Sequence, residues 1–578
     1  MTKWKSNCVD WVPRLSELKT KKVIPPKRWL LAPWQAVLLL SVYIGIVLNG
    51  AVFAKRFTEM GQSSQGAGWI FAELVLVFAF TALLLSLLDL TGKWIARTAI
   101  TLLLIISVLA SYYMSIFNVV IGYGVVQAVL TTDVDLSKEA VGVGLMVWFA
   151  TLALVPLLLW WRYVHVVRQS SVAGSARIKQ LTVRLVFALI FAGIVAVLAQ
   201  RMNSSQSGQI SVGQDIGQAN LVAHSYVPSN WVAGLGMSVS SAWDEWRSAS
   251  TKNDPAKQFA YDWSTDNKDV YVVMVIGESA RSGNFGLLGY DRPTTPLLAK
   301  TKNLVAFNGT SCNTSTKLSL QCMFVRPTAV VDRGMQAPQI LEDTVFSVFR
   351  KLGFTTELFA MQSELWFYNS LKPNHYKIRE VIAAEDANRN QPALDSFLES
   401  ELATSLTKHP QGRHIVVLHT KGSHFNYTSR YPREFAQYQP ECEGVDGACT
   451  KAQLINSYDN SILYTDAFLH RIMTSLADKK AMVIYTSDHG ESIDENRHFH
   501  ATPKPLAPIE QLQVPLLFWA SDAYLANPAR QKAFSQLRAA AKLPHAGVGH
   551  ANLFDSMLGC LGVTSANGGI DDKYNLCH

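Results

Sequence analysis

Five long apolar stretches in the first 200 residues constrain this chain more than any other feature of its sequence. They occupy residues 34–54, 68–88, 98–119, 141–161 and 182–200. Each reaches the ~20 apolar residues that a helix needs to cross the hydrocarbon core of a bilayer. After Gln200 no comparable stretch appears. The sequence therefore predicts a domain of five transmembrane helices, followed by a large part outside the membrane.

The segment before the first stretch indicates how the chain enters the membrane. It is mostly polar, and the stretch runs into Lys55-Arg56 without a small-residue cleavage site, so we expect a retained helix rather than a signal peptide. Its basic residues place the N-terminus in the cytoplasm under the positive-inside rule. They are Lys3, Lys5, Arg14, Lys19, Lys21, Lys22, Lys27 and Arg28.

Most of the loops agree with this orientation. The loops near Lys93 and from Arg162 to Lys179 are basic, whereas the loop around Asp133 to Glu139 is balanced to acidic; Lys55-Arg56 in the first loop is a mild exception. An odd number of crossings then puts everything after Arg201 outside the cytoplasm. The net charge of +8 is explained by this topology and by anionic lipid, so we expect no nucleic-acid partner.

Cysteine usage tests the topology independently. Six of the seven cysteines follow Arg201, where disulfides persist if that part lies outside the cytoplasm; Cys8 is the exception. No C-x-x-C spacing points to a cysteine zinc site. Sequence does not fix connectivity, but local pairing is the simplest arrangement: Cys312 with Cys322, Cys442 with Cys449, and Cys560 with Cys577.

Four regions follow from these patterns: residues 1–33 as a cytoplasmic segment, 34–200 as the membrane domain, 201–267 as a bridge, and 268–578 as a soluble domain. The bridge is polar except for Tyr226 to Trp243. That piece is either an interfacial helix on the membrane or an amphipathic helix packed on the soluble domain. Glu73 and Asn49 lie at spanning depth, where polar groups are either functional or bonded between helices.

From residue 268 onward, short apolar runs alternate with helical patterns, which is typical of an α/β domain with a mostly parallel sheet. Polar groups follow three of the runs: Glu278 after Val270–Ile276, His424 after His414–His419, and Asp488-His489 after Ala481–Thr486. Ligands of open α/β sheets bind beyond the carboxyl ends of strands. We therefore expect these groups to share one site.

The residue types in this set predict a metal site. Glu278, Asp488 and His489 supply carboxylate oxygen and imidazole nitrogen, the ligands of catalytic zinc. A hydroxyl of the segment Cys312–Lys317 is the fourth candidate, because a metal lowers the pKa of a bound alcohol enough to make it a nucleophile. An Asp-His pair or a Glu at one strand end is more often structural. Their joint placement in one domain carries the prediction.

At these residues the chain resembles the phosphoethanolamine transferases of Gram-negative inner membranes, which belong to the sulfatase and alkaline-phosphatase-like superfamily. The resemblance extends over nearly the whole chain, including the five helices. Its motifs are Val275–Arg281, Leu288–Arg292, Cys312–Phe324, Ser457–Asn460, Ser487–Ser492 and His500. It implies an N-terminal five-helix membrane domain plus a C-terminal sulfatase-like α/β domain in the periplasm.

The resemblance also implies a role for each residue. Thr316 is the nucleophile, and Glu278, Asp488 and His489 join it on one Zn²⁺, with a second ion possible. His424 and His500 handle the substrate phosphate. His498 is an alternative to His500, which is favoured because Ala501-Thr502-Pro503 follows it. Thr314 lines the head-group pocket, and Gln362 and Ser363 are further substrate-binding candidates.

Three stretches look closest to the branch of the family that modifies the outer Kdo sugar of lipopolysaccharide: Thr316–Arg326, Ala360–Glu364 and His419–Tyr427. The implied reaction moves phosphoethanolamine from phosphatidylethanolamine to Kdo2-lipid A through a phospho-threonine. Alternatives are modification of a lipid A phosphate, a sulfatase-like hydrolase, and a non-catalytic scaffold. Intact Glu278, Thr316, Asp488 and His489 argue against the scaffold.

Overall fold

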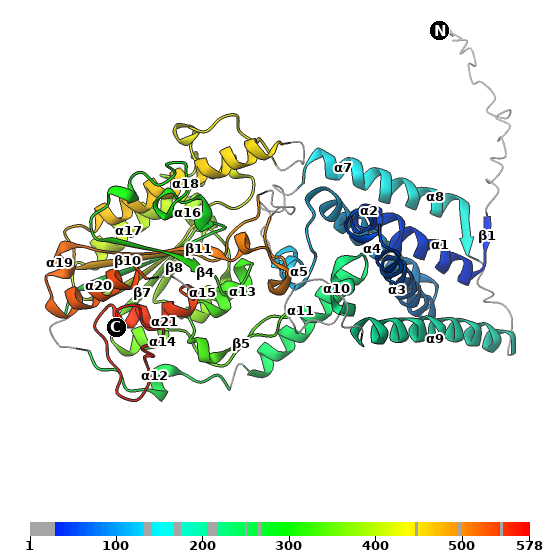
Figure 1. Cartoon of the computed structure of the whole chain (residues 1–578), viewed down its shortest axis with the longest axis horizontal. Helices are drawn as coiled ribbons and strands as arrows, with labels where there is room; N and C mark the ends of the chain where they lie inside the picture. Colours follow the sequence, from blue (N-terminus) through cyan, green and yellow to red (C-terminus); the bar gives the residue numbers. More distant parts are fainter. Residues whose placement is uncertain are drawn as a thin grey trace, which may run out of the picture.

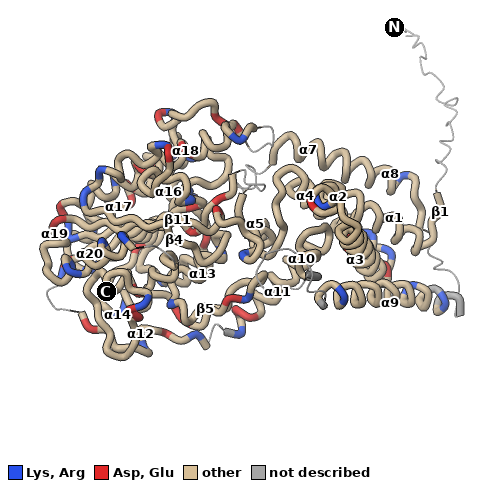
Figure 2. Tube along the Cα trace, in the orientation of Figure 1, with Lys and Arg blue, Asp and Glu red and all other residues tan. Residues whose placement is uncertain are grey.

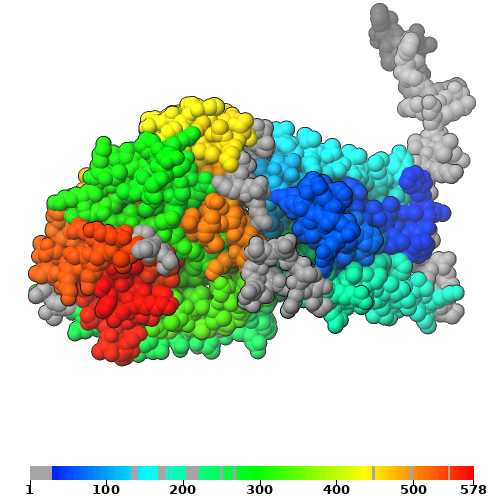
Figure 3. All heavy atoms as spheres, in the orientation of Figure 1, coloured from blue at the N-terminus to red at the C-terminus, as the bar shows by residue number. Residues whose placement is uncertain are grey.

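The computed structural model describes residues 29–131, 141–166, 175–204, 218–248, 251–263, 268–444, 449–493, 499–543 and 547–578 (Figure 1). The basic N-terminal segment with Cys8, the loop around Asp133 to Glu139, and His498 lie outside these ranges. The molecule is elongated, with a helical unit at one end and an α/β unit at the other (Figure 3).

The helical unit confirms the prediction of five membrane-spanning helices. The described residues contain five helices long and apolar enough to cross a bilayer. They are α1–η1–α2 (Pro33–Met60), α3 (Ser64–Leu90), α4 (Lys93–Phe117), α7–η2–α8 (Val143–Tyr163) and α9 (Ser175–Ser204). Charged residues are sparse along α1, α4, α7 and α8 (Figure 2), as a hydrocarbon environment requires. The short strands β1 (Trp29–Leu31) and β2 (Val164–Val166) pair beyond the helix ends.

The first of these helices departs from the expected span because it continues to Met60 and is interrupted by the 3-10 turn η1 (Val47–Asn49). Asn49 lies at the interruption and is fully buried. Its amide donates to the carbonyl of Gly45 at 2.9 Å and to that of Val227 at 2.8 Å, and its Oδ1 accepts from Val227 N at 2.9 Å. Asn49 therefore ties the first membrane helix to the bridge.

Glu73 makes a second tie between the same regions. It is 3% exposed on α3, and its carboxylate accepts from Arg56 at 2.5 and 3.2 Å and from the Tyr226 hydroxyl at 2.5 Å. Both polar groups at membrane depth thus bond to the bridge at Tyr226–Val227 as well as within the helical unit.

The bridge forms two helices, α10 (Gln218–Ser225) and α11 (Ser229–Ser248). The start of α11 packs on the membrane helices, where Trp231 donates to Ser107 Oγ at 3.2 Å. Its end reaches the α/β unit, where Asp244 pairs with Arg333 at 2.8 Å, and Trp243 beside it is exposed. The helix thus contacts both units, which combines parts of the two interpretations of this segment.

The α/β unit is built on a seven-stranded sheet in the order β4-β11-β10-β3-β9-β7-β8. β10, β3, β9, β7 and β8 run parallel, whereas β11 is antiparallel to β10 and to β4. The strands are β3 (Val270–Gly277), β4 (Leu304–Thr310), β7 (Thr355–Ala360), β8 (His375–Lys377), β9 (Arg413–His419), β10 (Ala481–Ser487) and β11 (Gln513–Ala520). A two-stranded sheet joins β5 (Val330–Val331) and β6 (Gln339–Ile340). The expected mostly parallel sheet is confirmed.

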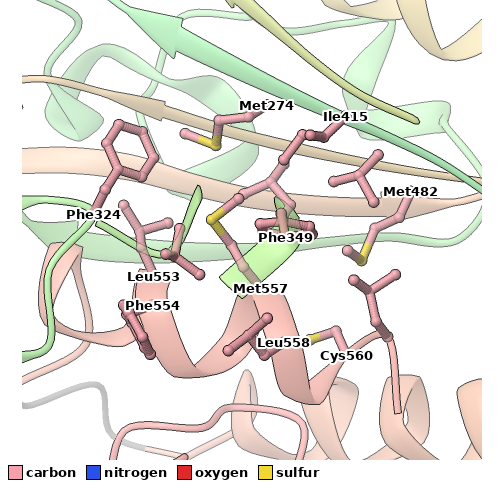
Figure 4. Packing of buried hydrophobic residues seen from close by; sticks show 14 of the residues in the cluster. Met274, Phe324, Phe349, Ile415, Met482, Leu553, Phe554, Met557, Leu558 and Cys560 are labelled. Atoms are coloured by element: carbon pink, nitrogen blue, oxygen red, sulfur yellow. The ribbon is translucent and has the colours of Figure 1, made fainter. Parts of the chain in front are cut away.

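Helices cover both faces of this sheet, because alternate residues of each strand point to opposite faces. Met274 and Ile276 of β3 pack on one face, and Val273 and Val275 on the other. The first face carries α12 (Pro255–Gln258), α13 (Thr316–Cys322), α14 (Phe346–Lys351), α15 (Leu365–Leu371), α19 (Asp522–Leu525), α20 (Pro528–Ala540) and α21 (Leu553–Gly559). Figure 4 shows Leu553 and Met557 of α21 pointing toward the strands. The second face carries α16 (Arg379–Ala384), α17 (Phe397–Lys408) and α18 (Lys451–Ser475).

Candidate active site

The candidate site lies where two central strands end side by side. β3 and β10 are parallel neighbours with Gly277 opposite Ser487, so Glu278 and the pair Asp488-His489 leave the sheet at the same point. All three side chains are fully buried. His489 Nε2 lies 3.3 Å from Glu278 Oε1 and 3.3 Å from Asp488 Oδ2. The structure therefore brings together the three groups expected to hold a metal.

Thr316 completes this cluster from a different direction. It is the first residue of α13, and its hydroxyl donates to Glu278 Oε2 at 3.1 Å and lies 3.4 Å from His489 Nε2. The Cys312–Cys322 disulfide closes the segment around it. His550 adds a further link, because its Nδ1 accepts from Cys312 N at 3.2 Å and its Nε2 donates to the Ser487 carbonyl at 2.9 Å. The threonine loop is thus fixed to the end of β10.

The charges of the cluster are strongly coupled. Burial opposes ionisation of Glu278, but the hydrogen bond and charge of His489 outweigh it and keep the pKa of Glu278 well below its usual range. Burial and the charge of Glu278 raise the pKa of Asp488 well above its usual range. Although burial opposes it, Asp488 and Glu278 together raise the pKa of His489 to about 10. In the protein alone, burial and mutual interaction thus favour an ionised Glu278, a protonated His489 and a neutral Asp488.

The geometry of these groups fits a metal ion. Two backbone amides, of His489 at 2.8 Å and Ser279 at 3.3 Å, fix Asp488 Oδ1, whereas Oδ2 forms no hydrogen bond with any described residue. His489 Nδ1 donates to the Gly490 carbonyl at 2.8 Å, so Nε2 is the ring nitrogen that faces the carboxylates, and it would bind a metal after losing its proton. Two carboxylate oxygens, one imidazole nitrogen and one hydroxyl are a ligand set for zinc with a reacting group in the open position.

Two further histidines lie beside the cluster. Glu278, His489 and His500 each offer an atom within 4.8 Å of the others, a grouping able to hold a cation that shares Glu278 and His489 with the cluster above. His500 is oriented by Glu491, whose Oε2 lies 2.9 Å from its Nδ1. The ring centroid of His424 lies 5.4 Å from that of His500, and burial lowers the pKa of His424 well below its usual range. His424 is therefore a neutral imidazole facing the same space.

The three substrate-binding candidates occupy different positions. Gln362 is buried beside the predicted metal ligands, where its amide donates to Glu278 Oε2 at 2.8 Å and to the Thr420 carbonyl at 2.9 Å. Thr314 is buried, and its hydroxyl donates to the Thr502 carbonyl at 2.6 Å. Ser363 contacts Glu380 Oε1 at 2.6 Å on the surface. Of the three, Gln362 is the one that touches a predicted metal ligand.

Sequence reasoning missed the residues that support the site from behind. His419 Nε2 lies 3.2 Å from the Gln362 amide, and its Nδ1 lies 2.8 Å from the Tyr368 hydroxyl. Asp395 accepts from the backbone amides of Lys421 and Gly422 at 2.6 and 3.0 Å, and so shapes the loop that leads to His424. His419, Lys421 and Gly422 lie in the stretch His419–Tyr427, but these contacts join segments far apart in the chain, and no motif pairs them with Tyr368 or Asp395.

The helical unit also reaches the threonine loop. The short helix α5 (Tyr123–Thr131) follows the third membrane helix, and its Gln127 Oε1 accepts from Lys317 Nζ at 2.5 Å. Gly124 of α5 packs closely against Ser315 and Ala501, since a Cβ added at Gly124 would lie 3.3 Å from an atom of each. The residue next to Thr316 is therefore held by the membrane unit.

The remaining cysteines form two disulfides, Cys442–Cys449 and Cys560–Cys577. With Cys312–Cys322 they are the three local pairs that the sequence predicts. The second joins the end of α21 to the C-terminal residues, next to the main core.

Comparison with known proteins places the chain in a family. The sulfatase family model matches residues 271–563, and the model described as phosphoethanolamine transferase EptA/EptB matches residues 77–206. The chain is 45% identical to the Kdo(2)-lipid A phosphoethanolamine 7''-transferase of Escherichia coli K12 over 93% of its own length and 96% of the relative, and 44% identical to that of Salmonella typhimurium. The chain belongs to the phosphoethanolamine transferase family, and it is an enzyme of that class.

A solved structure supports the architecture as a whole. The integral membrane lipooligosaccharide phosphoethanolamine transferase A (EptA) from Neisseria meningitidis superposes with a TM-score of 0.79 at 26% identity. The match covers 95% of this chain and 99% of that protein. The prediction of a five-helix membrane domain joined to a sulfatase-like domain is confirmed, and the protein is a multi-pass membrane protein.

Proposed function

We propose that this enzyme transfers phosphoethanolamine from phosphatidylethanolamine to lipopolysaccharide, at the Kdo sugar of Kdo2-lipid A, through a covalent phospho-threonine at Thr316. One observation carries the proposal. The Thr316 hydroxyl lies 3.1 Å from Glu278 and 3.4 Å from His489 in a buried cluster at two strand ends. The assignment of the acceptor rests on the name of the E. coli relative and its 45% identity.

Zn²⁺ is the cofactor that we assign to the cluster, held by Glu278, Asp488, His489 and Thr316. When bound, zinc supplies positive charge that favours deprotonation of the threonine hydroxyl and offsets charge developing on phosphate oxygens. The support for it is the ligand chemistry and the carboxylate oxygen of Asp488 that forms no hydrogen bond with a described residue. His500 groups with Glu278 and His489 as a possible set of metal ligands, so a second cation would share those two residues with the first.

The reaction has two displacements. Thr316 Oγ1 attacks phosphorus in line, so that a new O–P bond forms while the bond to the glycerol oxygen breaks and diacylglycerol leaves after taking up a proton. An acceptor hydroxyl then attacks the phospho-threonine, loses its proton, and releases Thr316. His424 and His500 lie beside the cluster and exchange these protons. We retain Thr314 and Ser363 as proposed head-group contacts, although the Thr314 hydroxyl already donates to Thr502 and Ser363 to Glu380.

The anchor serves this chemistry because both substrates are amphiphiles. Tethering the catalytic unit beside the bilayer raises their effective concentration at Thr316. We place the N-terminus in the cytoplasm and the catalytic unit in the periplasm of the inner membrane. The support is the basic N-terminal segment and the three disulfides of the α/β unit, which persist in an oxidising compartment.

The test is the covalent intermediate. The full chain is incubated with phosphatidylethanolamine alone and analysed by intact-mass spectrometry. We expect one phosphoethanolamine on the wild type and on the surface variant Thr404→Ala, and none on Thr316→Ala. Modification of Thr316→Ala would overturn the assignment of the nucleophile. Steady release of free phosphoethanolamine without acceptor would instead show a hydrolase.

The acceptor needs a separate measurement. Lipopolysaccharide is isolated from cells with and without the protein and cleaved between Kdo and lipid A by mild acid. The masses of both fragments are then measured by mass spectrometry. We expect the added mass on the Kdo fragment. Its appearance on the lipid A fragment would overturn the Kdo assignment while leaving the transfer chemistry in place.

A further inference from the structure

A cavity of about 570 Å³ opens at the end of the helical unit that faces away from the α/β unit. Helices α1, α3, α4 and α8 and strand β2 line it, and Figure 1 shows β1 and the end of α8 at this far end of the molecule. Thr316 begins α13 in the α/β unit, close to α5, and Figure 1 shows α13 and α5 well away from β1 and the end of α8. The cavity therefore belongs to a different part of the molecule from the candidate active site.

The walls of the cavity are apolar and open to the surroundings. Leu39, Val42 and Val47 line it from the first membrane helix, and each is exposed by more than 40%. Leu104 and Leu157 form the deeper wall. Because these residues lie in helices long and apolar enough to span a bilayer, the exposed walls contact acyl chains rather than water.

Two cations lie at one end of this apolar space. Lys93 and Arg97 occupy the first turns of α4 and line the cavity. The guanidinium carbon of Arg97 lies 4.5 Å from the centroid of the Trp161 ring, which holds it at the rim. Asp89 also lines the cavity, but it forms an ion pair with Arg184 at 3.2 Å. The net charge offered to a ligand is therefore positive.

We propose that this cavity is a binding site for an anionic glycerophospholipid from the leaflet remote from the catalytic unit. Its phosphate lies against Lys93 and Arg97, and an acyl chain lies along Leu39, Val42 and Val47. Basic pockets between membrane helices bind phosphate-bearing head groups in this way. A zwitterionic lipid is bound less well, because Asp89 is already neutralised by Arg184 and offers little to an ammonium group.

The experiment measures lipid retained by the purified full chain. The protein is extracted in mild detergent, exchanged into phosphatidylglycerol and phosphatidylethanolamine in equal amounts, and analysed by native mass spectrometry. We expect phosphatidylglycerol to be preferred by the wild type. The double variant Lys93→Gln/Arg97→Gln should lose about 30-fold in affinity for it, since each cation near the head group contributes about fivefold.

Two further variants make the result decisive. Lys179→Gln removes an exposed cation of α9 that does not line the cavity, and should retain phosphatidylglycerol as the wild type does. Leu39→Trp keeps both cations but fills the apolar wall, and should also lose the lipid. Equal retention of both lipids by the wild type, or unchanged retention by the double variant and by Leu39→Trp, would overturn the proposal.

Discussion

Two buried acidic clusters in this molecule handle their charge in opposite ways. In the helical unit, Glu73 is satisfied by the chain itself, because Arg56 supplies the cation and Tyr226 a hydroxyl donor. In the α/β unit, Glu278 and Asp488 share a single imidazole, and no Lys or Arg among the described residues forms an ion pair with either. An oxygen of Asp488 also forms no hydrogen bond there.

The difference separates structure from function. Burying a carboxylate is costly unless a cation and hydrogen bonds compensate for the lost water. Where the chain supplies that compensation, as at Glu73, the cluster holds two segments together. Where it does not, as at Glu278 and Asp488, we infer that a cation from outside the chain supplies the missing positive charge. Variants of the two clusters should therefore fail in different ways.

The largest effect is expected at the proposed metal ligands. Glu278→Gln and Asp488→Asn each remove a carboxylate charge, and should weaken zinc binding by more than about 100-fold, beyond what loss of a supporting residue costs. Transfer should fall to background. The measurements are zinc competition with a chromophoric chelator and the phospho-threonine assay.

Glu357→Gln is the matched control for those ligands, because Glu357 is buried in β7 but is compensated by Lys408 at 3.0 Å and by Ser405. It should lose stability and keep its zinc affinity. If Asp488→Asn bound zinc as tightly as the wild type, Asp488 would have no role as a ligand. The contrast between the Glu73 and Glu278 clusters would then be wrong.

The opposite failure is expected at Glu73. Glu73→Gln leaves Arg56 without its counter-charge and should destabilise the protein by about 3 kcal/mol, the cost of breaking a buried pair. Thermal unfolding in detergent measures the loss, and the zinc affinity of the folded protein should not change. The double variant Arg56→Gln/Glu73→Gln should lose less than the sum of the single variants. Additive losses would show that the pair does not act as a unit.

A smaller effect is expected at Gln362, which supports the proposed metal ligand Glu278. Gln362 donates to Glu278 without neutralising its charge, so it orients the carboxylate and leaves it anionic. Gln362→Met keeps the length of the side chain and removes the donor, and should weaken zinc binding about 10- to 100-fold. Ser363→Ala, which alters only a surface contact with Glu380, should bind zinc normally. Equal zinc affinity in the two variants would leave Gln362 as a head-group contact or a packing residue.

Much of the fold was predictable because its signals are local. Five apolar stretches predict the five membrane helices. Three apolar runs, followed by Glu278, His424 and Asp488, predict the central strands. The interruption at Asn49 was not predictable, because its cause is a contact with Val227, distant in the sequence. Helix α5 was also missed, since nine residues after a membrane helix do not stand out from it.

In the candidate site, only the proposed metal ligands and the nucleophile could be predicted from the sequence. Strand ends place Glu278, Asp488 and His489 together by a general rule of parallel sheets, and the family motif adds Thr316. The positions of the supporting residues Gln362, His419 and Tyr368 depend on how β7, β9 and α15 pack together. No local pattern encodes that packing, so Gln362 was assigned to the substrate although it contacts Glu278.

The smallest effect is expected at Asp555, a third buried carboxylate. It avoids the cost of a buried charge by keeping its proton rather than by pairing with a cation. It is fully buried in α21, its Oδ1 accepts from Asp571 N at 2.9 Å, and its Oδ2 has no hydrogen-bond partner among the described residues. Burial raises its pKa to about 7, so the folded protein holds a proton that the unfolded chain releases near pH 4. The stability that this proton supports is present at low pH and is lost as pH rises from about 4 through about 7.

Asp555→Asn removes that loss, while its amide carries two N–H groups that need acceptors, which offsets part of the gain. We expect the variant to be more stable than the wild type by about 1 kcal/mol at pH 8 and to lose this advantage at pH 5. Thermal unfolding at the two pH values measures the difference. A stability difference independent of pH would mean that Asp555 is ionised in the folded protein, and that burial without a cation does not by itself mark Glu278 and Asp488 as a metal site.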